Sequence, residues 1–374
     1  MLRILTLSVL PLMTLLSSCQ YESQPARATE AELSVEARIG KALFFDTSLS
    51  NPAGQSCASC HSPQHGFAEP DRRLPVSQGA NPANVGNRNA PSVAYAAFSP
   101  AFHFDKEEGL YIGGQFVDGR ASTLEEQALL PLLNPLEMNN ANAQEVLGKV
   151  READYALQIR QLYGEDVLDE TNKAMAAIGR AIAAYERSAE VVPFSSKYDQ
   201  YLSAQVSLTA QELRGLKVFE SENKGNCAAC HPNARGDNGA APLFTDFSYD
   251  NLGVAKNQAN PFYNMPARHN VDGKGFVDRG LGKVLNKPDE DGKFKVPTLR
   301  NIALTAPYMH NGVFDSLEDV VEFYNSRDSD KRWGTPEVGA NVNRQELGDL
   351  KLNQQELTDL VAFLQTLSDG YVGN

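Results

Sequence analysis

The sequence predicts a mainly α-helical fold of two domains with long irregular loops. Apolar residues recur at helical spacing in several segments, strand signals are weak and few, and one short motif occurs twice, at 57–61 and 227–231. A length of 374 residues allows two domains that each bury a core, and an apolar content of 42% excludes a disordered chain.

Residues 1–18 have the pattern of an export signal. One basic residue, Arg3, precedes an apolar run that contains Pro11 and is too short to span a membrane. The run ends in Leu-Ser-Ser-Cys, which resembles a bacterial lipoprotein cleavage site, so we expect Cys19 to be lipidated. The alternative is an ordinary secretion signal with an incidental cysteine. Residues 19–31 are polar and predict a tether. The protein is therefore expected in the periplasm, where it touches the membrane only through its anchor.

Helices are predicted wherever apolar residues repeat with the helical period. They are expected at 36–45, 124–133, 143–151, 171–190, 210–219, 317–324 and 354–367. The stretches 69–114 and 232–297 are rich in Gly, Pro and Asn and predict long loops, which in a compact domain usually serve a function. Residues 191–201 are expected to connect an N-terminal domain, 32–195, to a C-terminal domain, 196–374.

The duplicated motif is Cys-x-x-Cys-His. Its copies are Cys57, Cys60 and His61, and Cys227, Cys230 and His231. This is the attachment motif of c-type haem, in which both thiols bond to the haem and the histidine faces the iron. A shared zinc site would need the four cysteines close together, and a redox dithiol would not need the histidines. We therefore predict two covalently bound haem c groups, around which the long loops wrap.

The charge of the chain narrows its partners. Lys and Arg number 34 against 47 Asp and Glu, giving a formal net charge of −13. Such a chain repels phosphate backbones, so nucleic-acid binding is not expected, whereas a soluble cationic protein is a plausible partner.

The sixth ligand of each iron decides between electron transfer and peroxide chemistry, because a filled position favours the first and an open one the second. After the first motif the candidate ligands are His65 and His103. After the second they are Met265, His269, Met309, His310 and Tyr324. Spacing alone does not choose among them.

Several longer segments are shared with a known family. They are 43–50 (Leu-Phe-Phe-Asp-Thr-Ser-Leu-Ser), 88–92 (Arg-Asn-Ala-Pro-Ser), 116–128, 134–138 (Asn-Pro-Leu-Glu-Met), 242–253 and 294–312. Through them, nearly all of residues 33–367 resembles the bacterial di-haem cytochrome c peroxidases, and within these the MauG-like branch. The resemblance implies two cytochrome c-like helical domains, with the catalytic haem in the N-terminal one.

The resemblance also implies the catalytic residues. Gln127 and Glu137 match the pair on the open side of the N-terminal haem, and Pro131 matches a position beside it. Cleavage of peroxide needs a base that takes a proton and an acid that returns it, and a carboxylate in a partly dry pocket can do both. Glu137 is the expected acid and base, and Gln127 is expected to hold peroxide by hydrogen bonds.

Two departures from the family pattern affect the mechanism. Many relatives carry a histidine in the 71–88 loop that ligates the catalytic iron until the second haem is reduced, but here Ala80 occupies that position. The N-terminal haem is therefore expected to be open without reductive activation. Relatives usually place a tryptophan between the haems, where this chain has Val117. The single tryptophan, Trp333, could be a relay to a partner or a packed aromatic residue.

The remaining ligands follow from the resemblance as well. Tyr324, fourteen residues after His310, matches a position where classical members have methionine and MauG-like members have tyrosine. An anionic phenolate favours the higher oxidation states of iron and should lower the reduction potential of the second haem; the alternative is a core aromatic residue. The family's calcium ion maps to oxygen donors of Asn89, Thr305 and Pro307.

The expected function is that of a di-haem enzyme that activates hydrogen peroxide at the N-terminal haem. Electrons would pass through the His231/Tyr324 haem from a small cytochrome, or from a side chain of a partner protein that is thereby oxidised. The alternative is a non-enzymatic electron-transfer cytochrome with both irons fully ligated, against which Glu137 and Gln127 argue. A lipoprotein scaffold would leave this pair unexplained.

Overall fold

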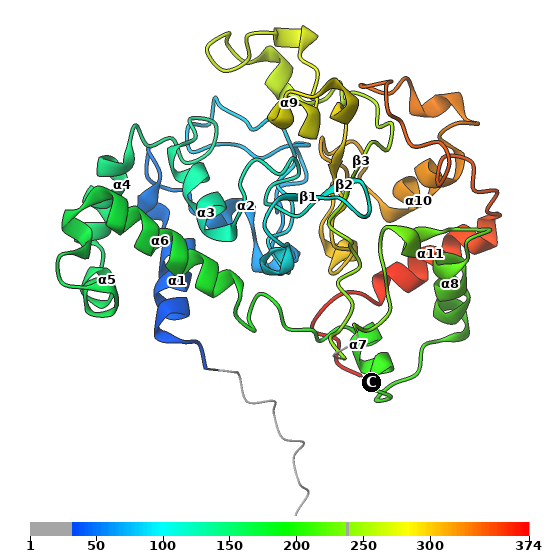
Figure 1. Ribbon diagram of the computed structural model, residues 1–374, viewed down its shortest axis with the longest axis horizontal. Coiled ribbons are helices and arrows are strands. Elements are labelled where there is room, and N and C mark those ends of the chain that lie inside the picture. The colour runs from blue at the N-terminus through cyan, green and yellow to red at the C-terminus, as the bar shows by residue number, and fades with distance from the viewer. Residues whose placement is uncertain (1–31, 237–238, 374) are drawn as a thin grey trace, which may run out of the picture. The chain divides into compact units, whose positions relative to one another are not determined.

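Helices dominate the computed structural model, which describes residues 32–236 and 239–373 (Figure 1). The α-helices are α1 (Val35–Phe45), α2 (Cys57–Cys60), α3 (Leu124–Leu133), α4 (Ala143–Glu152), α5 (Ala156–Tyr163), α6 (Thr171–Glu186), α7 (Lys197–Leu202), α8 (Ala210–Glu220), α9 (Leu281–Leu285), α10 (Leu317–Ser326) and α11 (Gln354–Gln365). The predicted mainly α fold is therefore confirmed. None of the helices described here has the length and apolar character needed to cross a membrane. The predicted export signal, Cys19 and the tether lie outside the described residues.

Within residues 32–236 and 239–373, the strands form two short antiparallel pairs. These pair β1 (His103–Asp105) with β2 (Leu110–Ile112), and β3 (Tyr249–Asp250) with β4 (Phe294–Lys295). All four strands fall inside the segments predicted as long loops, whose described residues otherwise contain only short helical turns, isolated bridges and helix α9. The loops are therefore irregular, but each contains backbone hydrogen bonds between short paired strands.

Side-chain caps define where several of the predicted helices begin. Ser34 accepts a hydrogen bond from the Ala37 N–H at the start of α1. The pairs Thr209/Glu212 and Asn353/Glu356 form reciprocal capping boxes at the starts of α8 and α11. These caps satisfy backbone donors that would otherwise be unpaired at each helix start.

Four of the described α-helices, α2, α5, α7 and α9, lie outside the predicted helical ranges, and the helix predicted at 171–190 was drawn too long. Helix α6 ends at Glu186 rather than at residue 190, because the chain turns there, with the N–H of Val191 bonded to the carbonyl of Ser188. Helix α7 lies inside the predicted connection. Its capping Asp199 forms an ion pair with Arg300 at 2.8 Å, a long-range contact that has no local signature. Helix α5 has no side-chain cap to announce it.

The same helix pair occurs twice. Helix α1 packs against α6, and α8 packs against α11 (Figure 1). A Cβ atom at Gly40 would lie 1.8 Å from the carbonyl oxygen of Ala181, and one at Gly215 would lie 1.9 Å from that of Asp359. Only glycine permits so close a crossing. In both cases the first helix of the pair leads into a Cys-x-x-Cys-His motif.

Buried apolar side chains form two main clusters, one drawn from residues 39–191 and the other from residues 198–367. The predicted boundary between residues 195 and 196 falls in the gap between them. By backbone contacts, however, the chain from Leu33 onward is one unit. The division into two domains therefore stays a prediction.

Buried ion pairs join segments that are far apart in the chain. The guanidinium of Arg88 lies 2.6 Å from carboxylate oxygens of both Asp118 and Asp278. Arg300, only 1% exposed, holds Asp199 through two hydrogen bonds. Such pairs must be kept together, because a buried charge that loses its partner is strongly destabilising.

Candidate active site

A single cavity of about 470 Å³ reaches both Cys-x-x-Cys-His motifs. Apart from Cys19, every residue that the sequence assigned to a site lines it: Cys57, Cys60, His61, Asn89, Gln127, Pro131, Glu137, Cys227, Cys230, His231, Thr305, Pro307 and Tyr324. The structure therefore brings together groups that are spread over more than two hundred residues of sequence.

The first motif occupies a single helical turn. Cys57 and Cys60 are the ends of α2, and the His61 N–H bonds to the Cys57 carbonyl at 2.9 Å. Burial raises the pKa of both thiols to about 12 and lowers the pKa of His61 to about 4. The imidazole of His61 is therefore neutral, which is the form that binds a metal.

The second motif fixes its histidine through the backbone. Nδ1 of His231 lies 2.8 Å from the carbonyl oxygen of Phe244, which can only accept, so Nδ1 carries the proton. Nε2 is left with a free lone pair. A hydrogen bond of this kind is what orients metal-bound histidines in proteins. The residues present therefore fit an iron ligand at this position.

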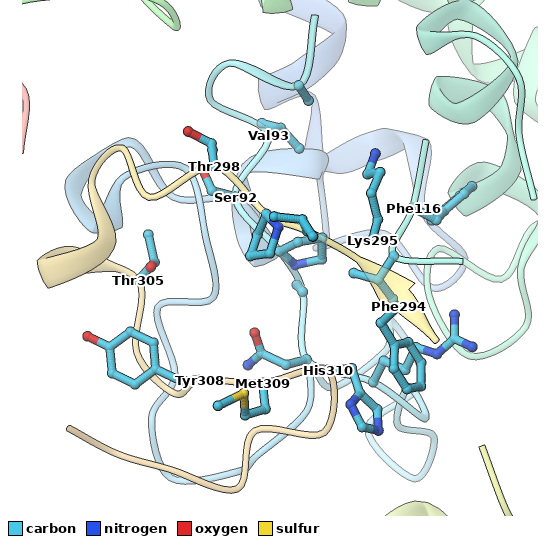
Figure 2. Close-up of a pocket in the computed structure, with 18 of the residues that line it drawn as sticks. Ser92, Val93, Phe116, Phe294, Lys295, Thr298, Thr305, Tyr308, Met309 and His310 are labelled. Carbon is cyan, nitrogen blue, oxygen red and sulfur yellow. The ribbon is translucent and has the colours of Figure 1, made fainter. Parts of the chain in front are cut away.

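A buried lysine gives a second test of fit to a haem. Lys295 lines the cavity, and its ammonium bonds only to the Gly114 carbonyl at 2.5 Å and the Ser99 hydroxyl at 3.4 Å (Figure 2). It forms no ion pair with a carboxylate of the described segments, and burial lowers its pKa to about 8. A partly buried ammonium that bonds to no carboxylate of the described residues, although the charge of Asp118 acts on it, suits the propionate of a haem.

The expected catalytic pair lies on and just after α3. Gln127 and Pro131 belong to the helix, and Glu137 follows it in a turn, its N–H bonded to the Asn134 carbonyl at 3.0 Å. Burial raises the pKa of the Glu137 carboxyl, against the opposing charge of Arg120. The protonated form of this carboxyl is therefore more favoured in the pocket than it is in water.

The 71–88 loop rests on the segment that carries Glu137. The Ala80 N–H donates to the Glu137 carbonyl at 2.8 Å, and a Cβ at Gly79 would lie 2.5 Å from the Leu136 carbonyl. Neither of the histidine candidates near the first motif lines the cavity. Nδ1 of His65 lies 3.2 Å from the Ser62 hydroxyl, and that of His103 lies 2.9 Å from the Ala101 carbonyl.

Three of the candidate ligands for the second iron line the cavity, namely Met309, His310 and Tyr324, whereas Met265 and His269 do not. Met265 belongs to a separate apolar cluster. Tyr324 belongs to α10 and lines the same cavity as Cys227 and Cys230, and burial raises its pKa.

Val117, which stands where relatives usually have tryptophan, lines the cavity and brings no aromatic ring to it. Its carbonyl accepts from the Lys295 N–H at 2.8 Å, so β4 runs beside it. The neighbouring Phe294 stacks on His310 with ring centroids 3.8 Å apart (Figure 2). Trp333 does not line the cavity; it packs edge-on against Phe323 at 5.5 Å.

Two further groups at the cavity are His310, which the sequence analysis named only as a candidate iron ligand, and Glu186, which it missed. Nε2 of His310 is buried without a hydrogen-bond partner in the described parts of the chain. Glu186 is 3% exposed, and burial raises its pKa to about 8. An acid four residues after Ile182, on the buried stripe of α6, was the available signal.

Comparisons with known proteins agree with this geometry. Residues 34–207 match the family described as di-haem cytochrome c peroxidase. The chain is 39% identical over 352 residues to methylamine utilization protein MauG of Paracoccus denitrificans, covering 89% of this chain and 88% of MauG. It is 32% identical over 349 residues to cytochrome c551 peroxidase of Nitrosomonas europaea, covering 92% and 83%.

Solved structures are similar as well. The diheme peroxidase BthA of Burkholderia thailandensis matches with a TM-score of 0.79 and 36% identity, over 91% of this chain and 87% of BthA. A MauG-like protein associated with microbial copper homeostasis matches with a TM-score of 0.67 and 31% identity, over 91% of each chain. These likenesses confirm the predicted cytochrome c-like fold class.

Proposed function

The chain belongs to the di-haem cytochrome c peroxidase family, whose members carry two c-type haems and act on peroxide, and from this premise we propose which residues do the work. Hydrogen peroxide is reduced where His61, Gln127 and Glu137 meet, and electrons arrive through the site of His231. The observation that carries the proposal is the single cavity lined by both motifs and by the catalytic pair.

The haem groups would be held by the four motif cysteines and by the imidazoles of His61 and His231. The buried ammonium of Lys295 would pair with a propionate. When bound, the haem iron supplies the electrons that break the O–O bond. The neutral state of both histidines, which burial favours by lowering the pKa of each, leaves a nitrogen lone pair for the iron.

Glu137 moves the protons. A carboxylate oxygen takes a proton from one end of the peroxide and returns it to the other, where the departing oxygen leaves as water. Because burial raises the pKa of this carboxyl, its carboxylate takes the proton more readily than a carboxylate in water would. The amide of Gln127 donates a hydrogen bond that holds the peroxide, and Pro131 packs beside it on the same helix.

The first site is open from the start. Ala80 has no side chain that could bind a metal, and its N–H already bonds to the Glu137 carbonyl. The loop therefore need not move away before peroxide binds. Absence of a histidine from residues 66–102 supports the same conclusion.

Tyr324 is the second ligand of the C-terminal iron. It lines the cavity beside Cys227 and Cys230, and no described residue forms a hydrogen bond with its hydroxyl. His310 is stacked on Phe294, which leaves Met309 as the competitor. A phenolate ligand would hold the second haem at a low potential and favour storage of an oxidising equivalent.

A calcium ion would sit between the halves of the chain. Asn89, Thr305 and Pro307 all line the cavity, and the Asn89 N–H bonds to the His310 carbonyl at 2.9 Å, which ties the two segments together. An amide oxygen and two backbone carbonyls are calcium ligands, and water would complete the shell.

The protein acts in the periplasm, attached through a lipid on Cys19. The sequence pattern around Cys19 supports this, and the acidic surface suits a soluble cationic electron donor. The likeness to MauG favours a second candidate for the electron source, a side chain of a partner protein that is oxidised in place of a cytochrome.

Adding peroxide to the ferric holoprotein, with and without reduced cytochrome c, tests the proposal. Rapid oxidation of the cytochrome would identify a peroxidase fed by a small cytochrome. A long-lived change in the haem spectrum that cytochrome c does not reverse would identify the protein-oxidising enzyme. No spectral change and no consumption of peroxide would contradict both.

A further inference from the structure

We propose that a second cavity, beside Cys60, is the passage through which hydrogen peroxide reaches the first site. The cavity has a volume of about 320 Å³ and lies under the loop that contains Ala80. This inference rests on the proposed function, because it names the route that the substrate of that function takes.

The second cavity adjoins the main one. Three residues line both, namely Gln55, Cys60 and Gln78. The outer end is bounded by Ala53, which is exposed to solvent. We call these three shared residues the partition between the two cavities. A molecule that enters beside Ala53 therefore passes only the partition before it reaches the edge of the first haem site at Cys60.

The lining of the second cavity is polar and carries negative charge. The Glu69 carboxylate accepts from the Ser77 hydroxyl and from the Asp71 N–H, the second at 2.9 Å. Asp71 lines the cavity as well. Hydrogen peroxide is neutral and both donates and accepts hydrogen bonds, so this polar lining suits it.

The partition offers a position where a passing molecule can form a hydrogen bond. The amide nitrogen of Gln55 donates to the Gln78 carbonyl at 2.7 Å. Its amide oxygen is buried and has no hydrogen-bond partner in the described parts of the molecule. A buried acceptor without a donor is costly, so an O–H group that passes here is stabilised. Peroxide supplies such a group.

The passage runs beside the peptide that carries the proposed acid and base. Ala80 lines the second cavity, and its N–H bonds to the Glu137 carbonyl at 2.8 Å. Its methyl group is small, so the cavity stays open at the position where a larger side chain would reduce it. The small residue at position 80 therefore opens a route as well as removing a ligand.

Filling the mouth of the passage tests the proposal. Ala53→Trp should slow the binding of both peroxide and cyanide to the ferric holoprotein by roughly an order of magnitude, while the resting haem spectrum stays unchanged. Ala141→Trp is the matched control, because Ala141 is also exposed but lines neither cavity. Stopped-flow absorbance gives both rates.

A second variant is needed because the indole of Ala53→Trp can point into solvent and leave the passage open. Leu74→Trp places bulk on the inner wall, since Leu74 lines only the second cavity. Cyanide and peroxide rates at the wild-type value in both variants would overturn the passage. Cyanide binding does not require peroxide reduction, so slowed cyanide binding in a protein that ignores peroxide would support the passage and contradict the proposed function.

Discussion

Burial shifts the pKa values of Glu137 and Lys295 in opposite directions, and both shifts suit the roles proposed for these residues. The Glu137 carboxyl has a raised pKa and the Lys295 ammonium a lowered one, because a low-dielectric cavity disfavours either charge. The first effect prepares a group to exchange protons. The second leaves a cation that a bound propionate would stabilise. Perturbed groups that converge on one cavity are typical of a functional site.

Removing the phenol of Tyr324 should change the second haem only. Tyr324→Phe is expected to raise its reduction potential and to alter its low-spin spectrum, because a hard anionic ligand is lost. Tyr308→Phe is the control, since Tyr308 lines the same cavity but its hydroxyl donates to the Ile302 carbonyl at 2.9 Å. Spectroelectrochemistry measures both. An unchanged Tyr324→Phe and a shifted Met309→Leu would assign the ligand to Met309.

At the scale of residues, the sequence predicts the groups that belong to motifs and misses those that do not. The site residues called from motifs lie on the cavity wall wherever the structure describes them. Glu186 lies in no shared segment, and Lys295, although it lies within the shared segment 294–312, was given no role there; the importance of both comes from burial. Burial depends on which loops cover a side chain, and that is decided by contacts between distant segments.

Helix α6 has an ionisable residue, Glu186, on the buried face where its sequence pattern otherwise places apolar side chains. Its buried stripe of Ala174, Ile178 and Ile182 continues into Glu186, whose carboxylate oxygen Oε2 is buried without a hydrogen-bond partner in the residues described. Helices α1 and α3 both pack on α6, and this packing keeps Glu186 buried at the end of the helix, near Cys57, in spite of the cost of desolvating its carboxylate.

Glu186 should make the protein less stable as the pH rises. Its folded-state pKa of about 8 lies above its ordinary value, so the folded state keeps a proton that the unfolded state releases from about pH 4.5 upward. Stability is lost between these values at about 1.4 kcal/mol per pH unit. Glu186→Gln should therefore be the more stable form near pH 8 and match the wild type near pH 5. Urea unfolding of the holoprotein measures this, and a pH-independent difference would contradict it.

At the scale of elements, most helices with strong periodicity appear where the sequence predicts them. The predicted helices 36–45 and 210–219 precede the two motifs, but their packing against α6 and α11 is a finding of the structure. Helix α7 was missed although Ser196 and Asp199 form a capping box at its start, and the ion pair of Asp199 with Arg300 adds a contact that the local sequence does not show. Strands β3 and β4 were missed because they pair across more than forty residues.

The whole molecule depends on ion pairs that cross between the two apolar clusters. Arg88 joins Asp118, from the N-terminal half of the chain, to Asp278, from the C-terminal half. All three side chains are largely buried, and Arg88 lines the cavity. The single cavity could not be predicted from two separate motifs, because these long-range contacts create it.

Arg88→Met should destabilise the folded protein by about 3–5 kcal/mol, because two buried carboxylates lose their shared partner. Adding Asp278→Asn should recover part of the loss, since one uncompensated charge is removed. Urea denaturation of the holoproteins measures both changes. A single variant as stable as the wild type would show that this bridge does not hold the halves together.

The central claim is that Glu137 handles the protons of peroxide in the cavity of the first motif. Glu137→Gln should lower the rate at which the ferric holoprotein reacts with peroxide by about 10²–10⁴-fold, with haem content and resting spectrum unchanged. Glu152→Gln, at the exposed end of α4, should react like the wild type. Stopped-flow absorbance gives the rates. A wild-type rate in Glu137→Gln would contradict the account.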